Sequence, residues 1–289
     1  SIALSGGLGI DSAHPLMADF NHKIVLGRTG LHVGRLGVAS GYGVPCAALE
    51  EAYERGANYF YWGSRRTREM GEAIRHLAKK DRAGLVVCVQ SYARMGFWLK
   101  RSFEKGLREL GLDYADVLLL GWYNDPPSAR IMDAATELVA SGRARHLAVS
   151  SHQRTMFPTL LDDQRIGLWQ VRYNAVHRGA EREVFSALDG LDLTKRPGVI
   201  TYTTTRWGHL VDPKRTPQGE TTPTGADCYR FAMSHPHVDV VMSGPANAGQ
   251  MREALRALEL GPMSDDELAR MRRIGDAPYG KDRTSNIWD

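Results

Sequence analysis

Residues 112–122 read Leu112-Asp113-Tyr114-Ala115-Asp116-Val117-Leu118-Leu119-Leu120-Gly121-Trp122, and the segment 115–120 at their centre is almost entirely apolar. A short apolar run of this kind is typical of a strand with both faces buried, as in a parallel sheet covered by helices. Seven further short runs occur along the chain, separated by segments with helical periodicity. These runs are 36–39, 57–61, 85–89, 146–149, 168–173, 198–202 and 238–242, and the clearest helical segments are 46–55, 99–110 and 131–141.

The repeat predicts an α/β fold, a (β/α)8 TIM barrel. Eight strand–helix units favour a closed barrel over an open doubly wound sheet, and 289 residues suit a barrel, for which about 250 residues is typical. Segments 23–26 and 31–33 flank a Gly-Arg-Thr-Gly turn, which predicts an N-terminal β-hairpin capping the bottom of the barrel. The segment 211–225 is rich in Pro, Thr and Gly, and we expect a long surface loop over the active face.

The domain organisation is expected to be simple. Residues 17–289 are predicted to form a single barrel domain, with Met17 as the natural start. Residues 1–16 lack the basic segment and apolar core of a signal peptide, and we interpret them as a tag or disordered arm.

Composition argues against several classes of partner. The formal charge is only +4, from 37 basic and 33 acidic residues, and no basic stripe alternates with stacking aromatics, so we expect no nucleic-acid binding. No apolar run is long enough to span a membrane. The three cysteines form no CxxC pair, so no zinc or iron–sulfur ligand set is present, and their sparse use indicates a reducing, cytoplasmic compartment. We expect a monomer or a small homo-oligomer.

Motifs in the right order connect the chain to a known family. The opening stretch 112–122 resembles the fourth-strand hallmark Leu-Gly-Leu-Asp-Tyr-x-Asp, an apolar run and His-Trp, of the aldo-keto reductases. Residues 26–31 resemble the family opening, 170–174 its sixth strand, 202–208 its seventh, and 243–253 its eighth strand and cofactor loop. The chain after Met17 therefore resembles a divergent, bacterial-type aldo-keto reductase. The resemblance implies a barrel that reduces carbonyl compounds with NAD(P)H, or runs the reverse reaction.

The four catalytic positions of that family are all replaced. In the family a tyrosine donates the proton, a lysine paired with an aspartate lowers the pKa of that tyrosine, and a histidine orients the carbonyl. Tyr61 stands at the aspartate position, Gln90-Ser91 at the lysine position and Gly121 at the histidine position, and the loop that carries the tyrosine is shortened to Trp62-Gly63-Ser64. Without the lysine, a tyrosine keeps a pKa of about 10 and is a poor acid–base group at neutral pH.

Three side chains are candidates for a non-standard proton donor. Tyr61, Tyr92 and His152 lie at or just beyond predicted strand ends, on the face where barrel enzymes place their sites. Two of them have a simpler alternative explanation. Tyr61 equally fits as a filler of the space left by the aspartate–lysine pair, and a histidine in a loop, such as His152, is more often a bystander.

The nicotinamide half of the cofactor site is better preserved. Under the resemblance, Ser150 and Gln170 hold the carboxamide of the nicotinamide, and Tyr202 stacks on its ring. Ser151 stands where the family usually has an asparagine, and it is a shorter partner.

The phosphate half of the site is also predicted from the resemblance. Ser243 and Gly244, followed by a helix N-terminus, suit a phosphate, and Glu253 matches a residue that binds adenine or its ribose. Gln250 stands where an arginine usually holds the 2′-phosphate, so the choice between NADPH and NADH stays open.

Three functions remain after these observations. The first is carbonyl/alcohol interconversion with NAD(P)H and a non-standard proton donor, acting on a small-molecule substrate that is flat or apolar. The second is a catalytically silent, nucleotide-binding sensor or partner subunit. The third is a non-redox lyase or cyclase that uses the aromatic mouth of the barrel.

Overall fold

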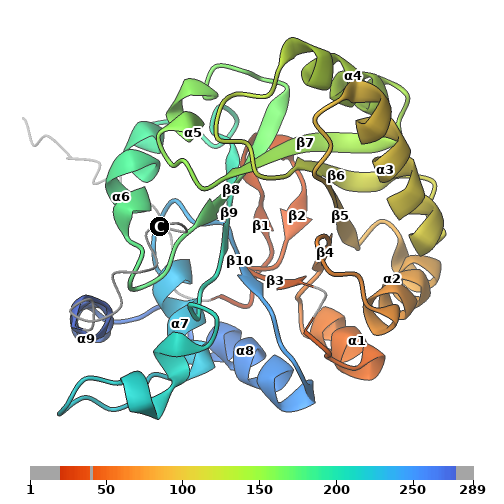
Figure 1. Ribbon diagram of the computed structural model, residues 1–289. Helices are drawn as coiled ribbons and strands as arrows, with labels where there is room; N and C mark the ends of the chain where they lie inside the picture. The colour runs from red at the N-terminus through yellow and green to blue at the C-terminus, as the bar shows by residue number, and fades with distance from the viewer. Residues whose placement is uncertain (1–19, 40–41, 278–289) are drawn as a thin grey trace, which may run out of the picture.

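The computed structural model describes residues 20–39 and 42–277, and their strands close into an eight-stranded parallel barrel in the order β10-β3-β4-β5-β6-β7-β8-β9 (Figure 1). This confirms the predicted (β/α)8 architecture. The segments 1–16 and 278–289, on which part of the domain prediction falls, lie outside the described residues. The strands are β3 Leu36–Ala39, β4 Tyr59–Trp62, β5 Val86–Ser91, β6 Ala115–Leu120, β7 Ala144–Ser151, β8 Ile166–Arg172, β9 Gly198–Tyr202 and β10 Val240–Ser243.

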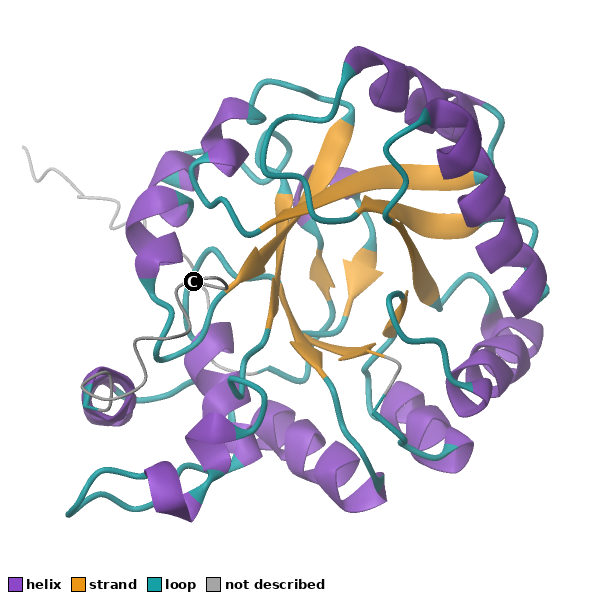
Figure 2. Ribbon diagram, viewed as in Figure 1, coloured by secondary structure: helices purple, strands orange, loops and turns teal. Residues whose placement is uncertain are grey.

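Helices surround the barrel as an outer layer (Figure 2). They are α1 Cys46–Glu54, α2 Arg68–Asp81, α3 Gly96–Leu110, α4 Ala129–Ala140, α5 Met156–Thr159, α6 Gly179–Glu183, α7 Gly225–Met233, α8 Ala248–Leu260 and α9 Asp265–Asp276, with short 3-10 turns η2 Phe185–Leu188, η3 His209–Val211 and η4 Pro213–Arg215. Among the described residues, no helix combines the length and apolar character that crossing a membrane requires.

The N-terminal hairpin caps the bottom of the barrel, as predicted. Strands β1 Ile24–Val25 and β2 His32–Val33 pair antiparallel around the 3-10 turn η1 Gly27–Thr29. Gly27 has a positive φ of 48°, and a Cβ there would overlap the backbone of Gly198 at the start of β9. Only glycine therefore allows the hairpin to sit so close to the barrel.

Two layers of apolar side chains result from strand alternation. In β6, Val117 and Leu119 point into the barrel, whereas Leu118 and Leu120 pack outward against the helices. The opening stretch is thus buried on both faces, as its composition indicates. Truncating one of these leucines to alanine is expected to cost about 2–5 kcal/mol.

The single charge inside that strand has a structural role. Asp116 is 2% exposed and accepts hydrogen bonds from Arg82 at 3.0 Å, Arg145 at 3.2 Å and the Val87 backbone N–H at 2.9 Å. A buried carboxylate needs such partners to offset its loss of hydration. The aspartate therefore fastens β5 and the start of β7 to β6.

One predicted loop lies in a different place. The outer part of segment 211–225 extends past α7 at the rim of the barrel (Figure 1), where Glu220 pairs with Arg270 at 3.5 Å and Arg273 at 3.3 Å on α9. The Thr221 carbonyl also accepts from Arg270. These contacts hold the segment against α9, so it is a rim loop and the expectation that it covers the active face is wrong.

Candidate active site

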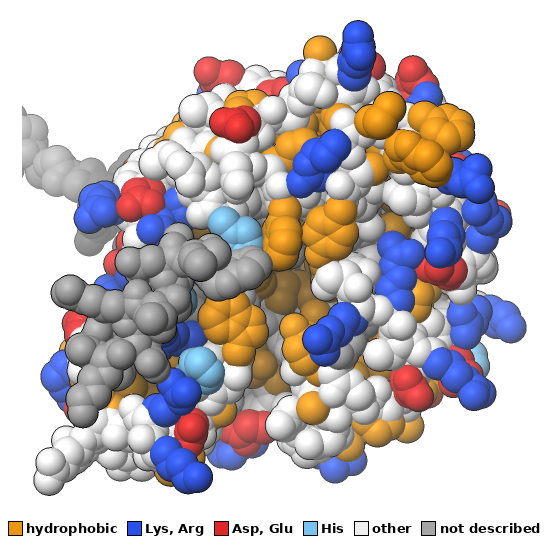
Figure 3. Space-filling model, viewed as in Figure 1, with side chains coloured by type: hydrophobic (Ala, Val, Ile, Leu, Met, Phe, Trp, Pro, Cys, Tyr) orange, Lys and Arg blue, Asp and Glu red, His pale blue; other side chains and the backbone are white. Residues whose placement is uncertain are grey.

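The C-terminal ends of the barrel strands surround a hollow mouth that is lined by hydrophobic side chains (Figure 3). Side chains alternate along a strand, so the residue two positions after the last inward core residue of a strand also points inward, at the mouth. The inward set at this level is Tyr61, Gln90, Gly121, Ser150, Gln170 and Tyr202, with Arg172 one layer above Gln170. Strand geometry therefore brings together four of the predicted site residues: Tyr61, Ser150, Gln170 and Tyr202.

Tyr61 and Gln90 form a pair in the centre of the mouth. The Tyr61 hydroxyl donates a hydrogen bond to Gln90 Oε1. Two glycines make room for this pair, because a Cβ at Gly63 would overlap the Tyr61 ring and a Cβ at Gly121 would overlap Gln90 Nε2. Gln90 is thus the inward residue of the Gln90-Ser91 pair. Ser91 points outward, and its hydroxyl hydrogen-bonds to Ser102 on α3.

The Tyr61 hydroxyl is a weak acid in this setting. Burial raises its pKa well above the usual value of a tyrosine, and the neighbouring Tyr92 and Cys88 act in the same direction. Cationic neighbours would have the opposite effect. Tyr61 therefore stays neutral across the physiological pH range.

Aromatic rings continue from this pair around the mouth. Tyr92 contacts Trp122 edge to face at 5.7 Å, Trp122 contacts His152 at 5.2 Å, and His152 contacts Tyr202 at 6.4 Å. Tyr92 is 42% and Trp122 47% exposed, so these two side chains of the series face solvent. An aromatic lining of this kind suits a flat or apolar ligand.

Trp122 is held in a backbone conformation that is rare for a bulky residue. Its φ is +58°, and its N–H donates to Ser150 Oγ at 3.1 Å. Arg94 donates to the Gly121 carbonyl at 3.0 Å and to the Trp122 carbonyl. Strain of this kind persists where surrounding contacts enforce it, which is frequent at ligand sites.

His152 and Arg172 form the polar part of the mouth. Burial lowers the pKa of His152 below its usual value, and the positive charge of Arg172 lowers it further. Arg172 is only 2% exposed, and it lies opposite Tyr202 in the β8–β9 register. The mouth thus presents a neutral imidazole beside a buried positive charge.

The predicted nicotinamide residues lie next to one another. Ser150 and Gln170 are direct neighbours in the β7–β8 register, and Tyr202 is on the adjacent strand β9. Gln170 Oε1 is buried, and no described residue donates a hydrogen bond to it. An unsatisfied buried acceptor is costly, so this oxygen fits a ligand that brings an N–H donor.

The predicted phosphate residues already have partners within the chain. Ser243 donates to the Gly37 carbonyl at 2.8 Å, Gln250 Oε1 accepts from the Ala246 N–H at 2.8 Å, and Glu253 accepts from the Ala226 N–H at 3.3 Å. These contacts hold the loop between β10 and α8. Gly244 lies beneath the ring of Tyr42, which a Cβ would approach to 3.0 Å.

Sequence reasoning missed two residues of this site. The resemblance does not assign a role to Arg172, which lies within the sixth-strand motif 170–174, and it gives Gln90 only as part of a replaced pair. Strand alternation was the available signal, since Leu168, Gln170 and Arg172 fall on one face of β8, as do Cys88 and Gln90 of β5.

Comparison with known proteins agrees with this architecture. The model of the aldo/keto reductase family matches residues 47–227. Among solved structures, the holo form of the aldo-keto reductase AKR11C1 from Bacillus halodurans superposes with a TM-score of 0.74 at 18% identity, covering 88% of this chain and 96% of that one. Its apo form superposes with a TM-score of 0.69, also at 18% identity, and covers 88% and 95% of the two chains.

Proposed function

This chain belongs to the aldo/keto reductase family, and from that membership we propose that it interconverts a carbonyl compound and an alcohol with NADH or NADPH. The observation that carries the proposal is Gln170 Oε1, the buried acceptor that no described residue satisfies. A nicotinamide carboxamide has the N–H donors that this oxygen lacks. Ser150 beside it and the Tyr202 ring on the next strand complete a pocket for an amide on a flat ring.

The rest of the nucleotide would extend toward the loop between β10 and α8. Asn247 already accepts from the Gln250 N–H at 2.9 Å, and Gln250 itself accepts from the Ala246 N–H. The first turn of α8 carries no basic residue, and Arg252 contacts Glu51 on α1 at 3.4 Å. The 2′-phosphate of NADPH would thus gain little from this loop, so we propose that NADH binds at least as tightly as NADPH.

Residues of this chain are proposed to supply the proton chemistry. When bound, a reduced nicotinamide supplies a hydride to the carbonyl carbon. His152, neutral at pH 7 because of burial and Arg172, is in the form that accepts the hydroxyl proton during alcohol oxidation. In carbonyl reduction its protonated form returns that proton to the oxygen. Arg172 favours negative charge on the same oxygen.

Tyr61 is assigned a different role from His152. Its hydroxyl is committed to Gln90, and burial holds its pKa far from the neutral range. We propose that Tyr61 shapes the floor of the mouth. Tyr92, which forms part of the wall, remains the alternative proton donor.

A second function is favoured by the same Tyr61–Gln90 pair. The pair fills the place where the family has its aspartate and lysine, so the barrel is also consistent with a nucleotide-binding sensor that lacks turnover. In that case the Gln170 pocket would be retained, and oxidation and reduction would both be absent.

One experiment separates these functions. The purified protein is titrated with NADH and with NADPH, following nicotinamide fluorescence and thermal shift, and then assayed against a panel of aldehydes and ketones. Saturable binding with turnover supports the reductase, and saturable binding without turnover across the panel supports the sensor. Absence of binding of either nucleotide refutes both and leaves a non-redox barrel.

A further inference from the structure

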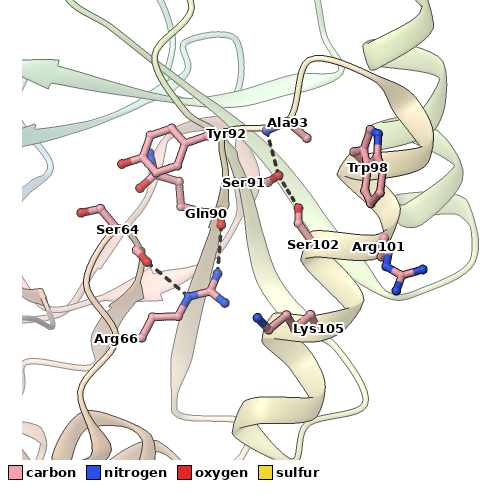
Figure 4. A pocket seen from close by; sticks show the side chains of 11 residues that line it. Ser64, Arg66, Gln90, Ser91, Tyr92, Ala93, Trp98, Arg101, Ser102 and Lys105 are labelled. Atoms are coloured by element: carbon pink, nitrogen blue, oxygen red, sulfur yellow. Dashed lines mark hydrogen bonds between the residues drawn. The ribbon is translucent and has the colours of Figure 1, made fainter.

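A second cavity opens beside the mouth, between the loop after β4, the end of β5 and the first turns of α3 (Figure 4). Its volume is about 620 Å³, and we call it the basic groove. Gln90 and Tyr92 line it, and both are also part of the mouth. The groove and the mouth therefore share a wall.

Three cationic side chains line the basic groove: Arg66, Arg101 and Lys105. Arg66 and Lys105 contact the same carboxylate, Glu109, at 2.7 Å and 3.8 Å. Arg101 contacts the Trp98 ring at 5.9 Å, and in the described part of the chain it forms no ion pair. The cations outnumber their compensating carboxylate, which leaves the groove with a positive potential.

Arg66 is the most rigidly held of these cations. Its Nε donates to the Gly63 carbonyl at 3.2 Å, Nη2 donates to the Gln90 carbonyl at 3.2 Å, and Nη1 donates to Glu109. The guanidinium also lies 5.6 Å from the Trp62 ring. A guanidinium has five N–H groups, so these three bonds fix its plane and leave capacity for an oxyanion.

The floor and the outer wall of the groove add two further kinds of contact. Ser91 and Ser102 contribute hydroxyls that hydrogen-bond to each other (Figure 4). Trp98 forms the outer wall and is 53% exposed, which is high for a tryptophan. Its ring offers a flat apolar surface beside Arg101.

We propose that the basic groove binds the oxyanion of a small, flat molecule, with a phosphate or carboxylate between Arg66, Arg101 and Lys105 and the ring against Trp98. Its position beside the mouth makes the groove the part of the substrate site that selects anionic carbonyl compounds. This link to catalysis rests on the proposed function, whereas the binding itself does not.

The binding is tested by calorimetry without any nucleotide. Three probes share one ring: phenyl phosphate, benzoate and the neutral benzyl alcohol. We expect both anions to bind and to lose affinity as salt rises, with benzyl alcohol at least about tenfold weaker. A preference for phenyl phosphate identifies a phosphate monoester as the ligand class, and a preference for benzoate identifies a carboxylate.

Matched variants locate the site. The double variant R101Q/K105Q removes two groove charges, and R108Q removes an exposed charge from the same helix outside the groove. We expect R101Q/K105Q to weaken anion binding by about tenfold or more, and R108Q to leave it unchanged. Circular dichroism checks that each variant is folded. Equal affinity of the three probes, or unchanged affinity in the folded double variant, overturns the proposal.

A kinetic comparison separates this inference from the proposed function. With 4-carboxybenzaldehyde as substrate, R101Q/K105Q should raise KM and leave kcat unchanged. With benzaldehyde, neither KM nor kcat should change. Anion binding without turnover of either aldehyde contradicts the proposed function and leaves the groove as a binding site. Turnover with equal KM changes for both aldehydes contradicts the role of the groove in substrate selection.

Discussion

The Tyr61 hydroxyl hydrogen-bonds to Gln90 across two neighbouring strands, and the absence of side chains at two glycines permits that contact. A neutral pair thereby occupies the centre of a mouth where the aldo-keto reductase resemblance places a charged one. Ser150, Gln170 and Tyr202, which the resemblance assigns to a nicotinamide, lie on the consecutive barrel strands β7, β8 and β9. Different residues therefore bear on the reaction and on cofactor binding, so variants can affect one without the other.

Gly121→Ala should destabilise the protein. Its Cβ would overlap Gln90 Nε2 and approach the Tyr92 ring to 2.9 Å, and overpacking of this kind costs about 1–3 kcal/mol. Urea unfolding measures the loss. In a Gln90→Ala background the same substitution should cost less, because the overlap with Gln90 is gone and only the approach to the Tyr92 ring remains; an equal cost in both backgrounds would assign the whole loss to Tyr92.

His152→Gln should lower turnover by about 10²-fold or more, which is the usual contribution of a general acid–base group. Tyr61→Phe should change kcat by only a few fold, because its hydroxyl contacts Gln90 and its pKa is far from neutrality. Steady-state kinetics with an active aldehyde measure both. Loss of activity in Tyr61→Phe, with His152→Gln still active, reverses the assignment.

The pH dependence of the reaction should report His152. Burial and Arg172 hold its pKa below the usual 6.5, so carbonyl reduction should accelerate as pH falls from 7.5 and level off only below pH 6.5. Alcohol oxidation, which needs the neutral imidazole, should be constant above that pH. Profiles of kcat/KM in both directions test this, and His152→Gln should abolish the pH dependence.

Gln170→Leu and Tyr202→Ala should each weaken nucleotide binding. The first removes the buried acceptor, and the second removes the stacking ring, and each is expected to raise Kd by about tenfold. Fluorescence titration with NADH provides the measurement. Tyr114→Ala, which alters a tyrosine before β6 at the opposite end of the barrel, serves as the control. Unchanged affinity in both site variants contradicts the assigned nicotinamide pocket.

His235 should make the fold sensitive to moderate acid. Burial lowers its pKa from 6.5 to about 4, although Glu181 and Asp189 oppose the shift. Because the unfolded chain binds this proton first, stability is complete above pH 6.5 and falls toward pH 4, by about 3 kcal/mol at most. His235→Asn keeps an acceptor for the His237 N–H and should flatten the unfolding free energy across this range. An unchanged slope assigns the acid sensitivity to other groups.

The sequence was sufficient for the fold because the strands are short apolar runs with regular spacing. Segments 115–120 and 198–202 coincide with β6 and β9. The predicted strand 57–61 begins two residues later, at Tyr59, because Asn58 uses its side chain to bind the Gly34 N–H and the His32 and Gly84 carbonyls. These three contacts join Asn58 to segments that are distant in the sequence, so they leave no signal in the local sequence pattern.

The site was only partly predictable, for a similar reason. Ser150, Gln170 and Tyr202 are named by the family resemblance, and they lie toward the C-terminal ends of β7, β8 and β9. The inward orientation of Gln90 and the burial of Arg172 depend on alternation within known strand limits, and a one-residue error in those limits reverses them. The in-chain partners of Ser243, Gln250 and Glu253 depend on packing between distant segments.

The paired glycines also constrain how this barrel can diverge. A histidine at position 121 would collide with Gln90, and a side chain at position 63 would collide with Tyr61, so each single change is expected to displace its neighbour and lower stability. The order of substitutions therefore matters, with Gln90 and Tyr61 changing before Gly121 and Gly63. Among relatives, these four positions should be inherited as a set, and lineages that acquired the set should rarely return to a charged mouth.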